Sequence, residues 1–84
     1  MPHIKMYTTS WCPDCRAAKN FLRERNVGFE EINIEEEAEA EEIVVRANDG
    51  KRIVPTFEVE GCYFACSPFD PELLAEELGV PLNP

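Results

Sequence analysis

The chain has 84 residues, with 8 Lys and Arg against 17 Asp and Glu, so its formal net charge is −9, and 44% of its residues are hydrophobic. This length is enough for one small domain, and we expect residues 1–84 to form a single domain with a thin core. The acidic balance argues against a nucleic-acid partner, because binding to a phosphate backbone requires a basic surface. Since no apolar run approaches the ~18 residues that span a bilayer and the N-terminus lacks a signal-peptide core, we expect a cytoplasmic protein without membrane contact.

The charge is unevenly distributed along the chain. Residues 1–29 hold five basic and two acidic side chains, whereas residues 30–84 hold three basic and fifteen acidic ones. A partner that approaches the first part of the chain therefore need not meet a strongly negative potential.

The first half of the chain predicts two strands separated by a helix. Residues 3–7 form a short β-compatible run that ends in a turn at Thr8-Thr9-Ser10. Pro13 suits the first turn of a helix, because its missing N–H would have no partner there, and apolar residues then recur at helical spacing up to residues 26–28. Residues 29–34 are rich in β-branched and aromatic side chains and predict the second strand.

An acidic helix and a hairpin are expected next. The stretch of about residues 36–48 predicts a helix, because its glutamates fall in the first turns, where the helix dipole favours negative charge. Residues 56–59 and 62–65 predict two short strands around a turn at Glu60-Gly61.

The last element predicted is a helix that begins at Asp70 and Pro71. Asp70 is a favourable N-cap and Pro71 fits the first helical position, while Gly79 and Pro81 end the helix and begin a tail over residues 79–84. The order is β-α-β-α-β-β-α. The expected fold class is therefore α/β, with one mixed four-stranded sheet flanked by helices.

The chemical signal in the sequence is the pair Cys12 and Cys15, which stands between the first strand and the first helix. A cysteine at a helix N-terminus has free N–H groups and the helix dipole beside it, and both stabilise a thiolate. Cys15 returns to the same face one turn later. We therefore expect Cys12 to attack a substrate disulfide and the shielded Cys15 to attack the resulting mixed disulfide, while Pro13 keeps the bridge between them stiff.

Three other roles for the cysteines compete with disulfide exchange. A c-type haem site requires His after the second cysteine, where Arg16 stands, and is dismissed. The alternative function is a metal-binding module, in which two or more of the four cysteines, Cys12, Cys15, Cys62 and Cys66, hold zinc or an iron–sulfur cluster. A merely structural pair is the third reading, although disulfides are rare in the cytosol.

Several neighbours of the cysteines carry expectations of their own. Asp14 disfavours an adjacent thiolate, but we expect its carboxylate to point into solvent, where it is screened. Trp11 is either a contact for a docking partner or a half-buried loop residue, and Arg52 is either a solvated turn residue or an attractor of anionic thiols. Cys62 is expected to be inert packing, and Cys66 is either a small buried residue at a strand end or a second redox residue.

Two motifs resemble the glutaredoxin branch of the thioredoxin superfamily, and mycoredoxins most closely. They are Met6-Tyr7-Thr8-Thr9-Ser10-Trp11-Cys12-Pro13-Asp14-Cys15 and Arg52-Ile53-Val54-Pro55-Thr56. The resemblance implies the same fold, with Cys12 as nucleophile and Cys15 as resolving thiol. It also implies a cis Val54-Pro55 bond and pairing of the Val54 backbone with the bound thiol or peptide. Other expected substrate contacts are Trp11, Pro13, Asp14, Arg52, Pro55 and Ser67.

The sequence departs from glutaredoxins that bind glutathione. The Gly-Gly pair of those proteins is replaced by Ala65-Cys66-Ser67-Pro68, and their basic residue three positions before the first cysteine is Thr9. The Ser67-Pro68-Phe69-Asp70-Pro71 run is similar to NrdH-redoxins, which accept electrons from thioredoxin reductase. We therefore expect a monomeric dithiol oxidoreductase that binds no cofactor or metal and reduces disulfide-containing proteins or their mixed disulfides. Its electron source would be a low-molecular-weight thiol, glutathione or mycothiol, or thioredoxin reductase.

Overall fold

A single four-stranded sheet forms the centre of the computed structural model, which describes residues 3–83. The strand order is β2-β1-β3-β4, with β1 and β2 parallel and the other neighbours antiparallel. The elements in chain order are β1 (Ile4–Thr8), α1 (Pro13–Glu24), β2 (Glu30–Asn33), α2 (Ala38–Ala47), β3 (Thr56–Val59), β4 (Cys62–Ala65) and α3 (Pro71–Leu78). The predicted fold class and element order are confirmed.

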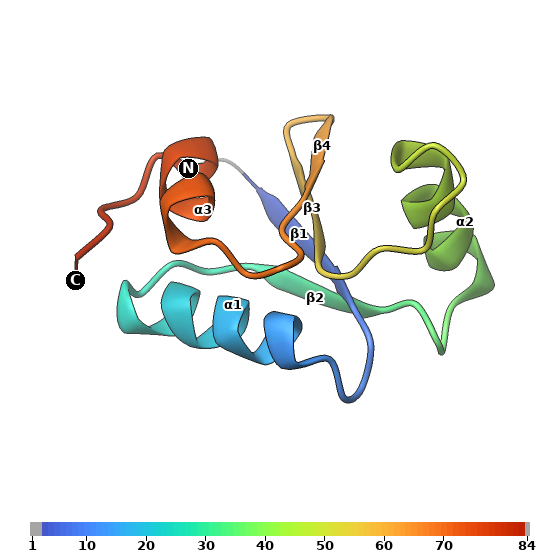
Figure 1. The fold of residues 1–84 in the computed structure, drawn as a ribbon, viewed down its shortest axis with the longest axis horizontal. Helices are drawn as coiled ribbons and strands as arrows, with labels where there is room; N and C mark the ends of the chain where they lie inside the picture. Colours follow the sequence, from blue (N-terminus) through green and yellow to red (C-terminus); the bar gives the residue numbers. More distant parts are fainter. Residues whose placement is uncertain (1–2, 84) are drawn as a thin grey trace.

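The helices cover the two faces of the sheet unequally. Helices α1 and α3 lie on one side of the strands and α2 lies on the other (Figure 1). The side chains of β1 alternate between these faces, as strand geometry requires. Ile4 and Met6 join the core under α1 and α3, whereas Tyr7 joins a smaller core under α2 that includes Ile34 and Val44.

The start of α1 is fixed by two residues that the sequence analysis identified. Cys12 is the N-cap, with an extended backbone at φ −90° and ψ 117°, and Pro13 is the first helical residue. Because β1 ends at Thr8, only residues 9–11 separate the sheet from this cap. The sulfur of Cys12 is thereby held at the N-terminus of α1, at one end of the sheet.

The acidic helix begins later than the sequence predicts. It starts at Ala38 rather than near residue 36, and its N-cap Glu37 makes no side-chain capping hydrogen bond. The preceding residues form a turn instead, because the Asn33 side chain accepts the Glu35 N–H at 2.8 Å and the Asn33 carbonyl accepts the Glu36 N–H at 3.1 Å. The local Asn33 contacts thus outweigh the tendency of the glutamates to join the helix.

The last helix agrees with its prediction. The carboxylate of Asp70 accepts the backbone N–H groups of Glu72 and Leu73 at 3.1 and 3.2 Å, and Gly79 ends the helix in the left-handed region at φ 67°. Met1, Pro2 and Pro84, which belong to the predicted domain and tail, lie outside the described residues. Within residues 3–83, every helix is too short or too polar to cross a membrane.

Candidate functional site

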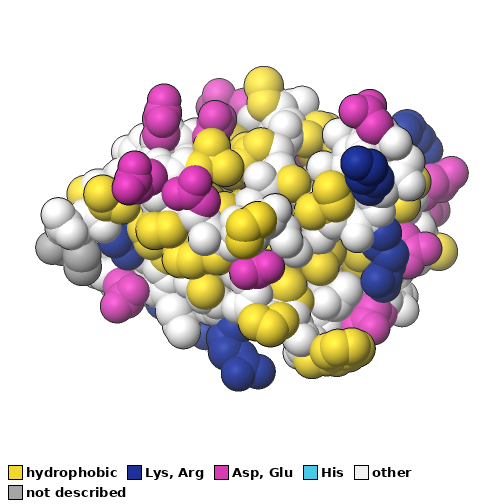
Figure 2. All heavy atoms as spheres, viewed as in Figure 1, with side chains coloured by type: hydrophobic (Ala, Val, Ile, Leu, Met, Phe, Trp, Pro, Cys, Tyr) yellow, Lys and Arg dark blue, Asp and Glu magenta, His cyan; other side chains and the backbone are white. Residues whose placement is uncertain are grey.

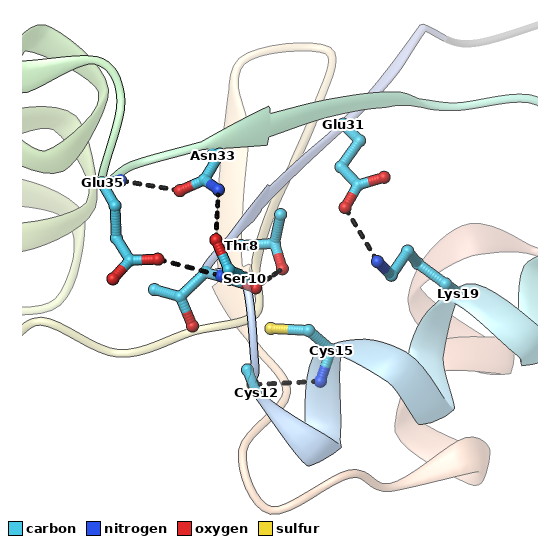
Figure 3. A network of polar contacts seen from close by, with 9 residues as sticks. Thr8, Ser10, Cys12, Cys15, Lys19, Glu31, Asn33 and Glu35 are labelled. Atoms are coloured by element: carbon cyan, nitrogen blue, oxygen red, sulfur yellow. Dashed lines mark hydrogen bonds and ion pairs between the residues drawn. The ribbon is translucent and has the colours of Figure 1, made fainter.

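Cys12 and Cys15 meet across the first turn of α1 (Figure 3). The Cys15 backbone N–H donates to the Cys12 sulfur at 3.1 Å. Cys12 is partly exposed, whereas Cys15 is 1% exposed, and both are free thiols. One sulfur of the pair can therefore meet a substrate while the other is shielded one turn deeper.

The environment of Cys15 keeps its thiol protonated. Burial, followed by the contact with the Cys12 sulfur, raises the pKa of Cys15 to about 12. A thiol is a poor nucleophile compared with its thiolate. Cys15 is thus a buried, protonated thiol near neutral pH, and Cys12 is the more accessible sulfur, which accepts a backbone N–H.

The segment before β3 forms the second side of the site. The Cys12 thiol donates to the carbonyl oxygen of Val54, with the sulfur 3.7 Å from the oxygen. The bond between Val54 and Pro55 is cis, as the resemblance implied. Val54 is partly exposed beside Cys12, whereas the side chain of Pro55 is fully buried.

Asp14 does not point freely into solvent, so that expectation was wrong. Its two carboxylate oxygens accept hydrogen bonds at 3.1 Å, one from the Ser67 hydroxyl and one from the Phe69 backbone N–H. The reason is tertiary: the segment between β4 and α3 lies against the start of α1 and presents two donors to the carboxylate. Ser67 is brought next to the cysteine pair by this contact.

The other predicted contacts are distributed around the pair. Trp11 is 77% exposed, so the half-buried alternative was wrong, and Pro13 is also exposed. Arg52 is directed to α2, where its Nε donates to the Glu41 carboxylate at 2.9 Å. This ion pair places the Arg52 guanidinium against α2, and the contacts described for residues 3–83 include none between Arg52 and either cysteine.

The remaining two cysteines differ from each other. Cys66 is 1% exposed, which confirms the expected buried strand-end residue. Cys62 is exposed, so its expected role in packing was wrong, because it begins the edge strand β4. In residues 3–83 no three His, Cys, Asp or Glu side chains are grouped so that they could hold a metal ion. A metal site built from three or more of the four cysteines is therefore not preformed in this part of the chain.

Sequence reasoning missed a set of contacts on the other side of Cys12. The Ser10 backbone N–H donates to the Glu35 carboxylate at 3.0 Å, and the Asn33 side-chain amide donates to the Ser10 hydroxyl at 3.0 Å. Figure 3 shows these residues between the end of β2 and the loop that leads to Cys12. Their signal in the sequence is only a parallel pairing of the two strands, which places the residues after each strand side by side.

Comparison with known proteins identifies the family. The family model described as Glutaredoxin matches residues 4–64. Mycoredoxin 1 of Corynebacterium glutamicum is 34% identical over 76 residues, which cover 90% of this chain and 94% of that protein.

Solved structures agree with this result. A crystal structure of a thioredoxin-like protein covers 96% of this chain and 100% of its own, with a TM-score of 0.81 and 30% identity. The structure of the NrdH-redoxin from Escherichia coli, a glutaredoxin-like protein with a thioredoxin-like activity profile, matches with a TM-score of 0.65 and 32% identity, over 75% of this chain and 80% of that one. The chain belongs to the glutaredoxin family.

Proposed function

We propose that this protein is a dithiol oxidoreductase that reduces disulfides through Cys12 and Cys15. The family and the fold support a thiol redox function. The observation that carries the specific proposal is the asymmetry of the pair: the partly exposed Cys12 sulfur accepts the N–H of Cys15, whose own sulfur is buried beside it. This asymmetry supports Cys12 as the attacking sulfur and Cys15 as the resolving one.

The reaction has two exchanges. The Cys12 thiolate attacks one sulfur of a substrate disulfide, which forms a mixed disulfide and releases the other sulfur as a thiolate that takes up a proton. Cys15 then loses its proton, and its thiolate attacks the Cys12 sulfur. The mixed disulfide breaks, the second substrate thiolate leaves and takes up a proton, and a Cys12–Cys15 disulfide remains. Two electrons have then passed from the pair to the substrate.

We propose disulfide-containing proteins and their mixed disulfides with a low-molecular-weight thiol as substrates. Apolar side chains cross the face seen in Figure 2, from the segment between β4 and α3 to the loop before α1. Exposed Trp11 and Pro13 flank Cys12 in the chain, and exposed Pro68 lies in the segment between β4 and α3. Such a surface suits a polypeptide, and the backbone of Val54 can pair with its main chain beside the reacting sulfur.

The disulfide that remains must be reduced by an external donor. The likeness to mycoredoxin favours a low-molecular-weight thiol such as mycothiol, whereas the likeness to an NrdH-redoxin favours thioredoxin reductase. Glutathione is the third candidate. Recycling assays with each donor, run with the same protein substrate, distinguish the three.

The test of the proposed roles is trapping of the intermediate. We expect Cys15→Ser to react once with a protein mixed disulfide and to retain one substrate thiol, seen by intact mass as an adduct on Cys12 that reductant removes. Cys12→Ser should form no adduct and lose turnover. Cys62→Ser, which removes the exposed thiol on β4, serves as the control with parent activity. Turnover by Cys12→Ser at the parent rate would refute the proposal.

A further inference from the structure

The loop of residues 9–11 connects β1 to Cys12, and its last two residues, Ser10 and Trp11, pack little against the rest of the protein. Trp11 is 77% exposed, so its indole contributes little apolar burial that would hold the loop. Ser10 is exposed as well. Burial of the Ser10 and Trp11 side chains therefore does little to fix this part of the loop, and the polar contacts of Ser10 supply a restraint.

Those contacts come from the residues that follow β2. Ser10 is held twice, through its N–H by the Glu35 carboxylate and through its hydroxyl by the Asn33 amide, each at 3.0 Å. The Asn33 side-chain oxygen in turn accepts the Glu35 N–H at 2.8 Å, which fixes the two holding residues to each other. Figure 3 shows that both side chains face Ser10 from the end of β2.

The position of this contact follows from the register of the sheet. In the parallel pair of β1 and β2, Thr8 lies opposite Asn33, and the Ile34 N–H still donates to the Thr8 carbonyl at 2.9 Å. Beyond that bond the ladder ends, and the side chain of Glu35 supplies the acceptor for the next N–H of the loop. Hydrogen bonds from the backbone and side chain of Ser10, and more weakly the charge of Arg52, hold the pKa of Glu35 below its usual value. The carboxylate is thus charged near neutral pH, and a charged acceptor makes the stronger hydrogen bond.

We infer that Asn33 and Glu35 are positioning residues that hold the Ser10–Trp11 segment in the conformation in which Cys12 and the indole of Trp11 receive a protein substrate. The expected effect on substrate kinetics rests on the proposed function, because it presupposes that the protein reduces disulfides. Neither residue touches the reacting sulfurs. Their effect reaches Cys12 through the two peptide units that follow Ser10.

The kinetic test uses three substitutions with a protein mixed disulfide as substrate. In Glu35→Ala, we expect KM to rise roughly three- to tenfold, because one charge-assisted hydrogen bond is lost, and we expect a smaller change in kcat. Glu35→Gln keeps an acceptor oxygen and should recover most of the parent KM. Glu36→Ala removes a neighbouring exposed glutamate and should behave as the parent. An unchanged KM in Glu35→Ala would overturn the inference.

A second readout does not depend on activity. Trp11 is the only tryptophan, so its fluorescence anisotropy decay reports the motion of this loop directly. We expect a larger fast component in Glu35→Ala and Asn33→Ala than in the parent, while the urea midpoint of unfolding changes little because the contacts are exposed. Parent-like anisotropy in both variants would refute the inference even if the protein reduces disulfides. A lack of disulfide reduction by the parent would instead refute the proposed function.

Discussion

Asp14 shows how one residue between the cysteines acts on both the charge and the shape of the site. Its carboxylate stands two residues after Cys12 in the chain, and a negative charge near Cys12 disfavours a thiolate. The same carboxylate binds Ser67 and Phe69, and so holds the segment before α3 against the start of α1. The charge and the hydrogen bonds thus have separate consequences, which two substitutions can distinguish.

Asp14→Asn should increase the reactivity of Cys12 and leave the loop in place. The amide keeps one acceptor for the Phe69 N–H and can donate to the Ser67 hydroxyl, but it removes the charge. We expect iodoacetamide to alkylate Cys12 about two- to fivefold faster at pH 7, measured in a Cys62→Ser background so that one accessible thiol remains. Asp14→Ala should show the same increase, together with a higher KM because the loop is released. Alkylation of Asp14→Asn at the parent rate would contradict the role of the charge.

The turn that joins Cys12 to Cys15 could be predicted from the sequence, whereas the contacts of Asp14 could not, because these contacts differ in their range along the chain. The Cys12 cap and Pro13 act within one turn of a helix, so the four adjacent residues 12–15 are enough to predict them. The donors that bind Asp14 are 53 and 55 residues away in the chain and follow a different strand. The Ser10–Glu35 contact is separated by 25 residues and was missed for the same reason.

At the scale of elements, α1 is fastened at its C-terminal end to the tail of the chain. The Arg25 guanidinium donates to the carbonyls of Phe21 at 2.8 Å and Pro81 at 2.6 Å, and to that of Leu82. It also lies over the Phe21 ring, 3.5 Å from the centroid, and its side chain is only 6% exposed. One guanidinium therefore binds a backbone carbonyl in the last turns of α1 and also the carbonyls of the segment that follows α3.

We expect Arg25→Ala to lower the free energy of unfolding by about 2–4 kcal/mol, because charged hydrogen bonds and a cation–π contact are lost together. Arg25→Lys should recover only part of this, since an ammonium cannot reproduce the planar set of donors. Urea unfolding measures the change, and hydrogen exchange at residues 82–83 reports release of the tail. Arg23→Ala, an exposed position on the same helix, is the matched control. A loss of stability no greater than that of the control would disprove the fastening.

The elements that the sequence predicted well are those with local signals. The hairpin strands agree with their predicted bounds because two apolar runs flank Glu60-Gly61, and both turn residues adopt positive φ. The helix α3 agrees because Asp70 caps it within three residues. The start of α2 was misplaced, since a run of glutamates looks uniform in sequence, and Asn33 decides which of them form a turn.

At the scale of the whole molecule, three titratable groups are buried in the two cores on either side of the sheet. Cys15, a residue of α1, and Cys66 belong to the core on the side of α1 and α3, and Tyr7 belongs to the core under α2. Burial is the main cause that raises the pKa of each group, to about 12 for Cys15. All three are neutral when protonated, so the folded protein prefers to keep these protons at high pH.

This preference makes the stability of the reduced protein fall in alkali. The pKa of Cys15 is raised from an ordinary value near 9 to about 12, so its contribution is complete below pH 9 and is lost as the pH rises toward 12. In that window the unfolded chain has released a proton that the folded chain retains, and each such group lowers the free energy of unfolding by up to about 1.4 kcal/mol per pH unit. Cys66 and Tyr7 act in the same direction.

Urea unfolding between pH 7 and pH 10.5 tests this with the oxidised protein as the comparison. A Cys12–Cys15 disulfide has no Cys15 thiol to titrate, so the oxidised form should lose stability less steeply, through Cys66 and Tyr7 alone. The stability difference between the oxidised and reduced forms should therefore grow with pH above 9, and Cys15→Ser should show the shallower slope of the oxidised form. Equal slopes for all three would mean that burial of the Cys15 thiol does not contribute to the stability of the reduced fold.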